Sequence, residues 1–231
     1  DGRGFYGQTW DMHDSATEHV VLLRVQPEDG PAALVFTTTG CVGQIGMNEA
    51  GVCVGINNLV ATDGCPGVMW TSVVRDALMQ DSAVAARDAI LAADLAGAHS
   101  FLVFDASGEG HMVEAFPTAR PTVTLDADAL VHTNHALWNE AVALEAPKHD
   151  VLKDSSTRRR ARALELLDRD GIDEHVLMAV TRDEGAICQV SREPFHIESS
   201  GAVIMRPRTL DFWAVWGLPS HNEYVHVPFA V

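Results

Sequence analysis

A carboxylate and an imidazole stand close together near the start of the chain. The stretch Gly7-Gln8-Thr9-Trp10-Asp11-Met12-His13 follows aromatic residues that favour strands, so we expect a β-strand there. Side chains alternate along a strand, which places Asp11 and His13 on one face and Trp10 on the other. The pattern fits a strand end at which an Asp begins a turn, and it equally fits an acid and an imidazole that serve a reaction.

A polar triplet occurs in a second stretch far along the chain. Leu130-Val131-His132-Thr133-Asn134-His135-Ala136-Leu137-Trp138 reads as a strand that ends in polar residues. Asn at a strand end is often turn chemistry. Its side-chain amide can also donate to an oxyanion, and removing such a donor typically costs about 10² to 10³ in rate. The residues alone leave both interpretations open.

Composition excludes several classes of partner. The 231 residues carry 16 Lys plus Arg against 32 Asp plus Glu, a formal net charge of −16. Nucleic acid is therefore not expected, because phosphate binding depends on basic patches. No apolar run approaches the roughly 18 residues that a membrane-spanning helix needs, so no membrane segment is expected. We expect one domain over residues 1–231.

The spacing of the cysteines and histidines indicates neither a redox motif nor a metal site. The four cysteines show no C-x-x-C pairing, which indicates free thiols and a cytoplasmic location. His111 and Glu114 suggest a metal site, but in a strand they point to opposite faces and no closed ligand set appears. No metal site is predicted.

Turn signals divide the chain into short strands and two helical blocks. Apolar runs on both faces indicate sheets that are covered on both sides. Helices are predicted at 71–79, 82–93, 154–167 and 172–181. Strands are predicted at 19–25, 32–38, 41–47, 52–56, 101–105, 111–116, 122–125, 129–132, 201–205, 212–216 and 224–227. This order suits two sheets packed between two helical layers.

Five stretches occur in the order found in one enzyme family. They are Gly-Gln-Thr-Trp-Asp at 7–11, the block at 36–59, Thr133-Asn134-His135, Asp154-Ser155-Ser156 before an Arg-rich helix, and Ala186-Ile187-Cys188. Together they resemble the acyl-coenzyme A:6-aminopenicillanic acid acyltransferase family, also called the isopenicillin N acyltransferase or peptidase C45 family. The resemblance implies an N-terminal nucleophile (Ntn) hydrolase, an α+β fold in which two mainly antiparallel sheets form a four-layer αββα sandwich.

The resemblance also implies catalytic roles. Asp11 matches the Asp just beyond the nucleophile strand, and Asn134 matches the oxyanion-hole Asn. Asp154 resembles the later acidic residue that assists self-cleavage and catalysis. Arg158 resembles the Arg on the following helix, with Arg159 as a close competitor.

Contacts to the substrate follow from the same resemblance. They are expected from Trp10, His13, Asn57 and His135. Where the family commonly has Ile-Cys-Arg-His, this chain has Ile-Cys-Gln-Val at 187–190, which puts a basic contact there in doubt and leaves Arg192 as the nearest replacement.

The family nucleophile is a Cys whose own α-amine acts as base, released when a precursor cuts itself into α and β chains. A residue inside a chain has an amide instead, so none of the four cysteines fits this role. From the spacing in the family and from hairpin geometry, we expect the nucleophile about 8 to 11 residues before Asp1, on a strand that pairs with the Gly-Gln-Thr-Trp-Asp strand. The cleaved α chain would precede it, and Asp1-Gly2-Arg3-Gly4 would form the turn between the strands.

The implied activity is hydrolysis or transfer of the acyl group of a small N-acyl amine or acyl thioester through a covalent acyl-enzyme, without a cofactor. Water and an amine would attack the same thioester from the same side, so the acceptor stays open, as does the oligomeric state. The alternative is a binding protein that kept the fold and lost the chemistry.

Overall fold

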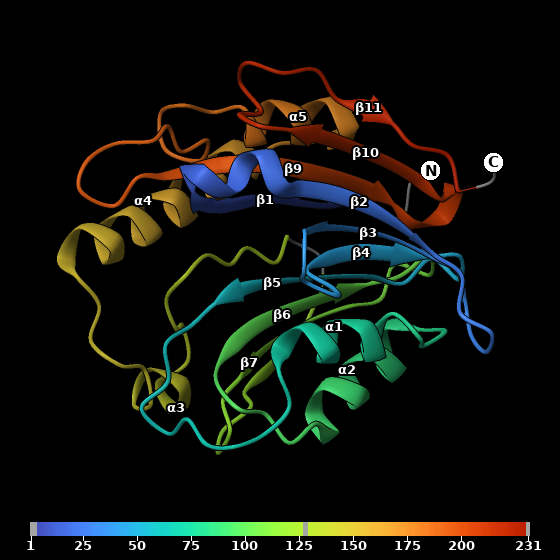
Figure 1. Ribbon diagram of the computed structural model, residues 1–231, viewed down its shortest axis with the longest axis horizontal. Helices are drawn as coiled ribbons and strands as arrows, with labels where there is room; N and C mark the ends of the chain where they lie inside the picture. Colours follow the sequence, from blue (N-terminus) through green and yellow to red (C-terminus); the bar gives the residue numbers. More distant parts are fainter. Residues whose placement is uncertain (1–3, 127–128, 230–231) are drawn as a thin grey trace.

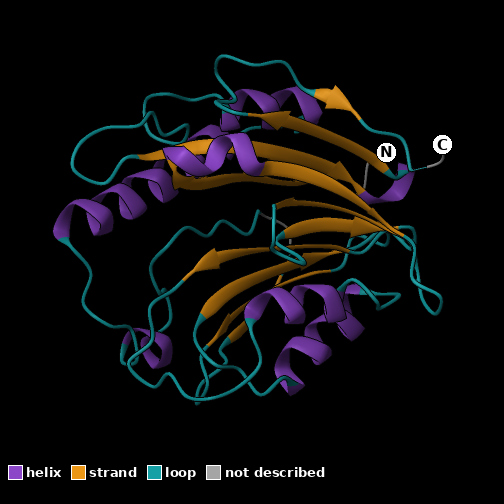
Figure 2. Ribbon diagram, in the orientation of Figure 1, coloured by secondary structure: helices purple, strands orange, loops and turns teal. Residues whose placement is uncertain are grey.

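The computed structural model describes residues 4–126 and 129–229 and consists of four layers (Figure 1). Two antiparallel sheets face each other in the middle, and helices lie outside them (Figure 2). The α+β sandwich predicted from the sequence is confirmed. The predicted turn at Asp1 to Gly4 lies mostly outside the described residues.

The larger sheet is a meander of seven strands, each antiparallel to its neighbour in the chain. Its central strands are buried almost throughout, because the other sheet covers one face and helices cover the opposite face. The strands are β2 (Val20–Val25), β3 (Ala33–Thr38), β4 (Ile45–Asn48), β5 (Cys53–Asn58), β6 (His99–Phe104), β7 (Gly110–Ala115) and β8 (Thr122–Thr124).

The smaller sheet has the strand order β1-β9-β10-β11. Its strands are β1 (Tyr6–His13), β9 (Ile197–Arg206), β10 (Asp211–Trp216) and β11 (Val225–His226). Strand β1 forms one edge, and β9 is its only sheet partner within the described part of the chain. A bulge interrupts this pairing: Trp10 lies opposite Gly201 and Asp11 opposite Ser199, so β9 carries one extra residue there.

Helices cover the two sheets unequally. Helices α1 (Trp70–Ala77) and α2 (Ala83–Ala92) lie on the outer face of the larger sheet, and α5 (Glu174–Thr181) packs on β1 and β9. Helix α4 (Asp150–Leu167) reaches the end of the sandwich where β1 stops (Figure 1). The short helices are α3 (Asn139–Val142), η1 (Asp14–His19) and η2 (Pro207–Thr209).

The two sheets lie close together at Gly55 of β5. A Cβ atom there would lie 2.1 Å from Gln8 Oε1 and 2.3 Å from the Tyr6 hydroxyl. The Tyr6 hydroxyl donates to Gln8 Oε1 (2.8 Å), and Gln8 Nε2 donates to the carbonyl of Ile56 (2.5 Å). A hydrogen-bonded link therefore joins β1 to the facing sheet, and it needs the space that a glycine leaves.

The order of the elements agrees with the prediction, whereas several boundaries differ. Strand β4 begins at Ile45 rather than at residue 41, because a turn precedes it in which Cys41 N–H donates to the carbonyl of Thr38. Helix α4 begins at Asp150, earlier than the predicted residue 154, because the His149 ring accepts a hydrogen bond from Val151 N–H.

The strand predicted at 129–132 is wrong. Residues 129–138 contain no strand, so Asn134 does not stand at a strand end. The backbone there bonds to side chains rather than to a neighbouring strand; for example, Arg160 Nε donates to the carbonyl of Val131 (3.1 Å). A short apolar run in the sequence does not reveal which partners its backbone will find.

Gly55→Ala is expected to destabilise the fold. The added methyl group must displace Gln8 and Tyr6, and overpacking of this kind typically costs about 1–3 kcal/mol. Thermal unfolding should show a lowered Tm, whereas the control Gly97→Ala, where a Cβ meets nothing within 4 Å, should unfold close to wild type. Equal Tm values for the two variants would contradict this account of the contact between the sheets.

Candidate active site

A cavity of about 1060 Å³ opens at the end of the sandwich where β1, the segment at 132–138 and α4 meet. Its wall combines apolar and polar side chains from both sheets, α4 and residues 184–197. Four apolar residues of this wall are exposed to solvent: Met12, Val60, Val151 and Val190. A cavity of this size, with a few converging polar groups, is typical of a site for a small molecule.

The cavity follows the edge of β1. Five successive residues of this strand, 8–12, line it. Since successive side chains point to opposite faces of a sheet, a wall made of every residue in a row lies along the strand edge. That edge is the one without a sheet partner in the described structure.

Asp11 projects from this edge strand at the bulge. Its Oδ1 accepts a hydrogen bond from the Ser199 hydroxyl (2.7 Å), and its Oδ2 lies 4.0 Å from Nη1 of Arg159. The side chain is 16% exposed, and it lines the cavity. One carboxylate oxygen is thus fixed by a neutral donor, and the other faces a cation.

Asn134 lines the same cavity and is held in one orientation. Its Oδ1 accepts from Nη2 of Arg159 (2.9 Å), so the nitrogen of the amide must lie at the other position. Its Nδ2 donates one hydrogen to the carbonyl of Asn58 (3.1 Å). The second hydrogen of Nδ2 has no acceptor among the described residues, which leaves it for a group in the cavity.

Arg159 of α4 connects the two. Its side chain is 13% exposed, and burial lowers its pKa while the Asp11 carboxylate opposes that shift. Of the two arginines that the sequence left open, Arg159 makes the contacts to Asp11 and Asn134. Arg158 is exposed and also lines the cavity, as does Asp154 one turn earlier on the helix.

An aromatic wall closes one side of the cavity. The ring of Trp10 lies 6.1 Å from that of Trp70, which in turn stacks on His99 at 5.0 Å. Burial lowers the pKa of His99 to about 4, so its imidazole is neutral near pH 7. Trp10 Nε1 and His99 Nδ1 are buried and have no hydrogen-bond partner within the described structure.

The remaining predicted residues separate into two groups. Trp10 and Asn57 line the cavity, whereas His13 and His135 do not. The side chain of His13 is 58% exposed and bonds Ser15 at the start of η1. His135 bonds the Ser156 hydroxyl through Nδ1 (2.7 Å), and its pKa is lowered, chiefly by burial.

Sequence reasoning did not identify Trp70, Ser199 or Lys148 at this site. Trp70 and Lys148 line the cavity, and Ser199 bonds Asp11. They come from elements far apart in the chain, and a Trp at a helix start or a Ser in a strand carries no local signal of chemistry.

No three His, Cys, Asp or Glu residues gather to form a metal site within residues 4–126 and 129–229. In the same part of the chain no helix has both the length and the apolar character needed to cross a membrane.

Comparison with known proteins identifies the family. The model of the acyl-coenzyme A:6-aminopenicillanic acid acyl-transferase family matches residues 1–201. A curated relative, the 40 kDa form of acyl-coenzyme A:6-aminopenicillanic-acid-acyltransferase from Emericella nidulans, is 28% identical over 157 residues, which cover 66% of this chain. The match spans 43% of that relative's length.

Solved structures show the same fold at low sequence identity. A variant of conjugated bile acid hydrolase from Clostridium perfringens superposes with a TM-score of 0.66 at 14% identity, covering 96% of this chain and 92% of that one. An N-acylethanolamine-hydrolyzing acid amidase orthologue from Caenorhabditis elegans gives 0.62 at 15%, covering 97% and 94%. Penicillin V acylase from Agrobacterium tumefaciens gives 0.61 at 12%, covering 96% and 82%. With a family match over residues 1–201 and the fold of these solved structures, the chain belongs to the acyl-coenzyme A:6-aminopenicillanic acid acyl-transferase family.

Proposed function

We propose that this protein cleaves or transfers the acyl group of a small N-acyl amine or acyl thioester through a covalent acyl-enzyme. The observation that carries the proposal is the convergence of Asn134 and Asp11 on one cavity, joined by Arg159, beside the edge of β1 that has no strand partner in the described part of the chain. The names of the relatives, which state acyltransferase, acylase or N-acylethanolamine-hydrolyzing activity, support an acyl substrate.

The nucleophile on this proposal is a Cys that precedes Asp1 and lies on a strand paired with β1. Within the described residues no other strand lies beside the free edge of β1, so its backbone groups are available to such a strand. Antiparallel pairing and the family spacing place the Cys about 8 to 11 residues before Asp1. Of the four cysteines in this sequence, Cys188 alone lines the cavity, and its nitrogen is part of a peptide bond.

The reaction then proceeds in two steps. The thiol passes its proton to its own α-amine, its sulfur bonds the substrate carbonyl carbon, and the C–N or C–S bond breaks as the leaving group takes up that proton. Water or an amine next attacks the thioester, loses a proton and releases the thiol. Asp11, whose Oδ1 is held by Ser199, is proposed to orient the protonated α-amine through Oδ2, the oxygen that also lies 4.0 Å from Arg159.

Asn134 stabilises the oxyanion in both steps. The second hydrogen of Nδ2 is available to it, and Arg159 prevents the amide from flipping. Arg159 also brings positive charge close to the developing negative charge. Asp154, which lines the cavity, is proposed to assist self-cleavage and catalysis, and Arg158, which also lines it, stays a candidate for the catalytic arginine beside Arg159.

The substrate is proposed to contact Asn57 and the aromatic wall of Trp10, with its apolar part near the exposed valines at the mouth. His13 and His135, expected at the substrate from the sequence, have no contact with the cavity. The competing interpretation, a binding protein without chemistry, predicts retention of such a ligand without turnover.

Asn134→Ala is expected to lower kcat by about 10² to 10³, since an oxyanion donor is lost. The assay is turnover of a panel of small N-acyl amines and thioesters by the protein expressed from its complete reading frame. Asn222→Ala is a matched control, because the Asn222 amide also donates to a backbone carbonyl, that of Leu218, away from the cavity. A near-normal kcat for Asn134→Ala would refute the oxyanion role.

Asp11→Asn is expected to impair both self-cleavage and turnover, because the neutral amide cannot hold a protonated α-amine. Intact mass of the purified protein reports cleavage, and kcat reports turnover. Asp14→Asn serves as control: this carboxylate lies three residues further on, bonds Ser191 and does not line the cavity. A processed, fully active Asp11→Asn protein with a lowered Tm would show that Asp11 is structural.

A further inference from the structure

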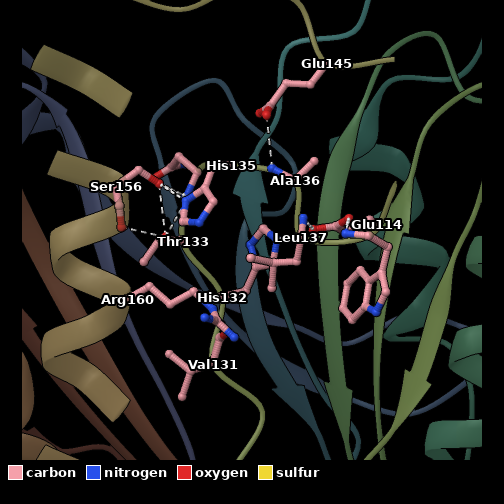
Figure 3. Close-up of polar contacts among 12 residues, drawn as sticks. Glu114, Val131, His132, Thr133, His135, Ala136, Leu137, Glu145, Ser156 and Arg160 are labelled. Atoms are coloured by element: carbon pink, nitrogen blue, oxygen red, sulfur yellow. Dashed lines mark hydrogen bonds and ion pairs between the residues drawn. The ribbon is translucent and has the colours of Figure 1, made fainter. Parts of the chain in front are cut away.

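The segment that carries Asn134 is irregular and is held by side chains (Figure 3). Backbone N–H groups between residues 134 and 138 donate to buried or half-buried oxygen atoms of Ser156, Glu145 and Glu114. Lys148 in turn donates to the carbonyl of Asn134. The N–H and C=O groups of a loop that pairs with no strand must find hydrogen-bond partners in this way, and each such bond fixes one point of the loop.

Glu114 of β7 holds the segment on both sides of Asn134. Its Oε1 accepts from His132 Nε2 (2.8 Å) and from Leu137 N–H (2.7 Å), and its Oε2 accepts from Trp138 N–H (3.3 Å). The side chains of Glu114 and His132 are both 0% exposed. A buried carboxylate is costly unless donors satisfy it, and here three donors from the Asn134 segment do so.

Ser156 of α4 holds the same segment from the opposite side. Its hydroxyl oxygen accepts from Asn134 N–H (2.8 Å), and it lies 2.7 Å from His135 Nδ1. Figure 3 shows Glu114 and Ser156 flanking the segment between them. The Asn134 backbone is therefore fixed between the larger sheet and the helix that supplies Arg159.

We propose that Glu114 is a positioning residue for the reaction, which acts through His132 and the backbone of residues 137–138 to place the Asn134 amide. This inference rests on the proposed oxyanion role of Asn134. Glu114 does not line the cavity and touches no reacting atom; its effect on the rate comes from where it puts Asn134. A displacement on the order of 1 Å in a catalytic group can cost about 10²-fold in rate.

Glu114→Gln is the informative change because it keeps the shape of the side chain. The Glu114 carboxylate can only accept, so Nε2 of His132 carries the hydrogen between the two side chains, while Nδ1 of His132 is buried without a partner among the described residues. Gln offers one oxygen and one NH₂ group to three donors, so one N–H of the segment must face another donor. The side chain keeps its volume, whereas the hydrogen bonds from Glu114 to the Asn134 segment weaken.

The test is a double-mutant cycle on kcat with Asn134→Ala in the protein from the complete reading frame. Glu114→Gln alone is expected to lower kcat by about 10²-fold with little change in KM. In the background of Asn134→Ala it should lower kcat no further, because the group it positions is already gone. Hydrogen exchange at the amides of Leu137 and Trp138 should accelerate in Glu114→Gln.

Asp105→Asn is the matched control. Asp105 is another buried carboxylate, 6% exposed, and it accepts from the N–H group of Ala83 at the start of α2 and from that of Ser107 in the turn between β6 and β7. Its loss should lower Tm yet leave kcat and the exchange of the 137–138 amides unchanged. If Glu114→Gln does not fold, Glu114→Asp, which keeps the charge but is too short to reach all three donors, enters the same cycle.

The outcomes are distinct. A wild-type kcat in Glu114→Gln, or losses that add in the double mutant, would overturn the positioning role while the oxyanion role stands. A wild-type kcat in Asn134→Ala would overturn the oxyanion role and the positioning role with it, whereas a wild-type protein that turns over no acyl substrate would overturn the proposed function. Faster hydrogen exchange at the Leu137 and Trp138 amides in Glu114→Gln would then show that Glu114 orders the segment for some purpose other than catalysis.

Discussion

One buried guanidinium connects the three parts of the chain that form the cavity. Arg159 lies on α4, bonds the Asn134 amide and faces the Asp11 carboxylate on β1. A buried cation needs a carboxylate and further acceptors in fixed places, and these two side chains supply them. The charge of Arg159 therefore constrains the helix, the loop and the strand to one mutual arrangement, which is the arrangement the proposed chemistry requires.

Buried polar groups outside the cavity likewise fix the position of the Asn134 segment. Asn134 lies on a segment without strand partners, so its path depends on Glu114 and Ser156, which are themselves buried and fully committed to it. The larger sheet provides the fixed end of this arrangement, since β7 is buried along its whole length. The segment satisfies the Glu114 carboxylate and the Ser156 hydroxyl, and buried polar groups that are satisfied in this way favour one geometry.

The sequence predicted the layers well, because strand alternation and glycine turns are local signals that the sheets obey. The predictions were wrong for segments whose contacts come from residues far away in the sequence. The run at 130–132 has strand-like residues, yet the carbonyl of Val131 accepts from the Arg160 side chain, which no local pattern reveals. Arg158 and Arg159 are adjacent on α4, and only the orientation of that helix decides which of them reaches Asn134. His13 shares a strand with Asp11, but the strand runs past the cavity and takes the imidazole to Ser15.

The central claim is that the acyl group passes through a thiol on a strand beside β1. The most direct measurement is intact mass and peptide mapping of the protein from its complete reading frame, quenched with acid during turnover of a small acyl thioester. The account predicts an adduct of one acyl group on a Cys with a free α-amine that precedes Asp1. An adduct on Cys41, Cys53, Cys65 or Cys188 would contradict it. Turnover without any adduct would also contradict it, provided that acylation of the enzyme is shown to be faster than release of the acyl group.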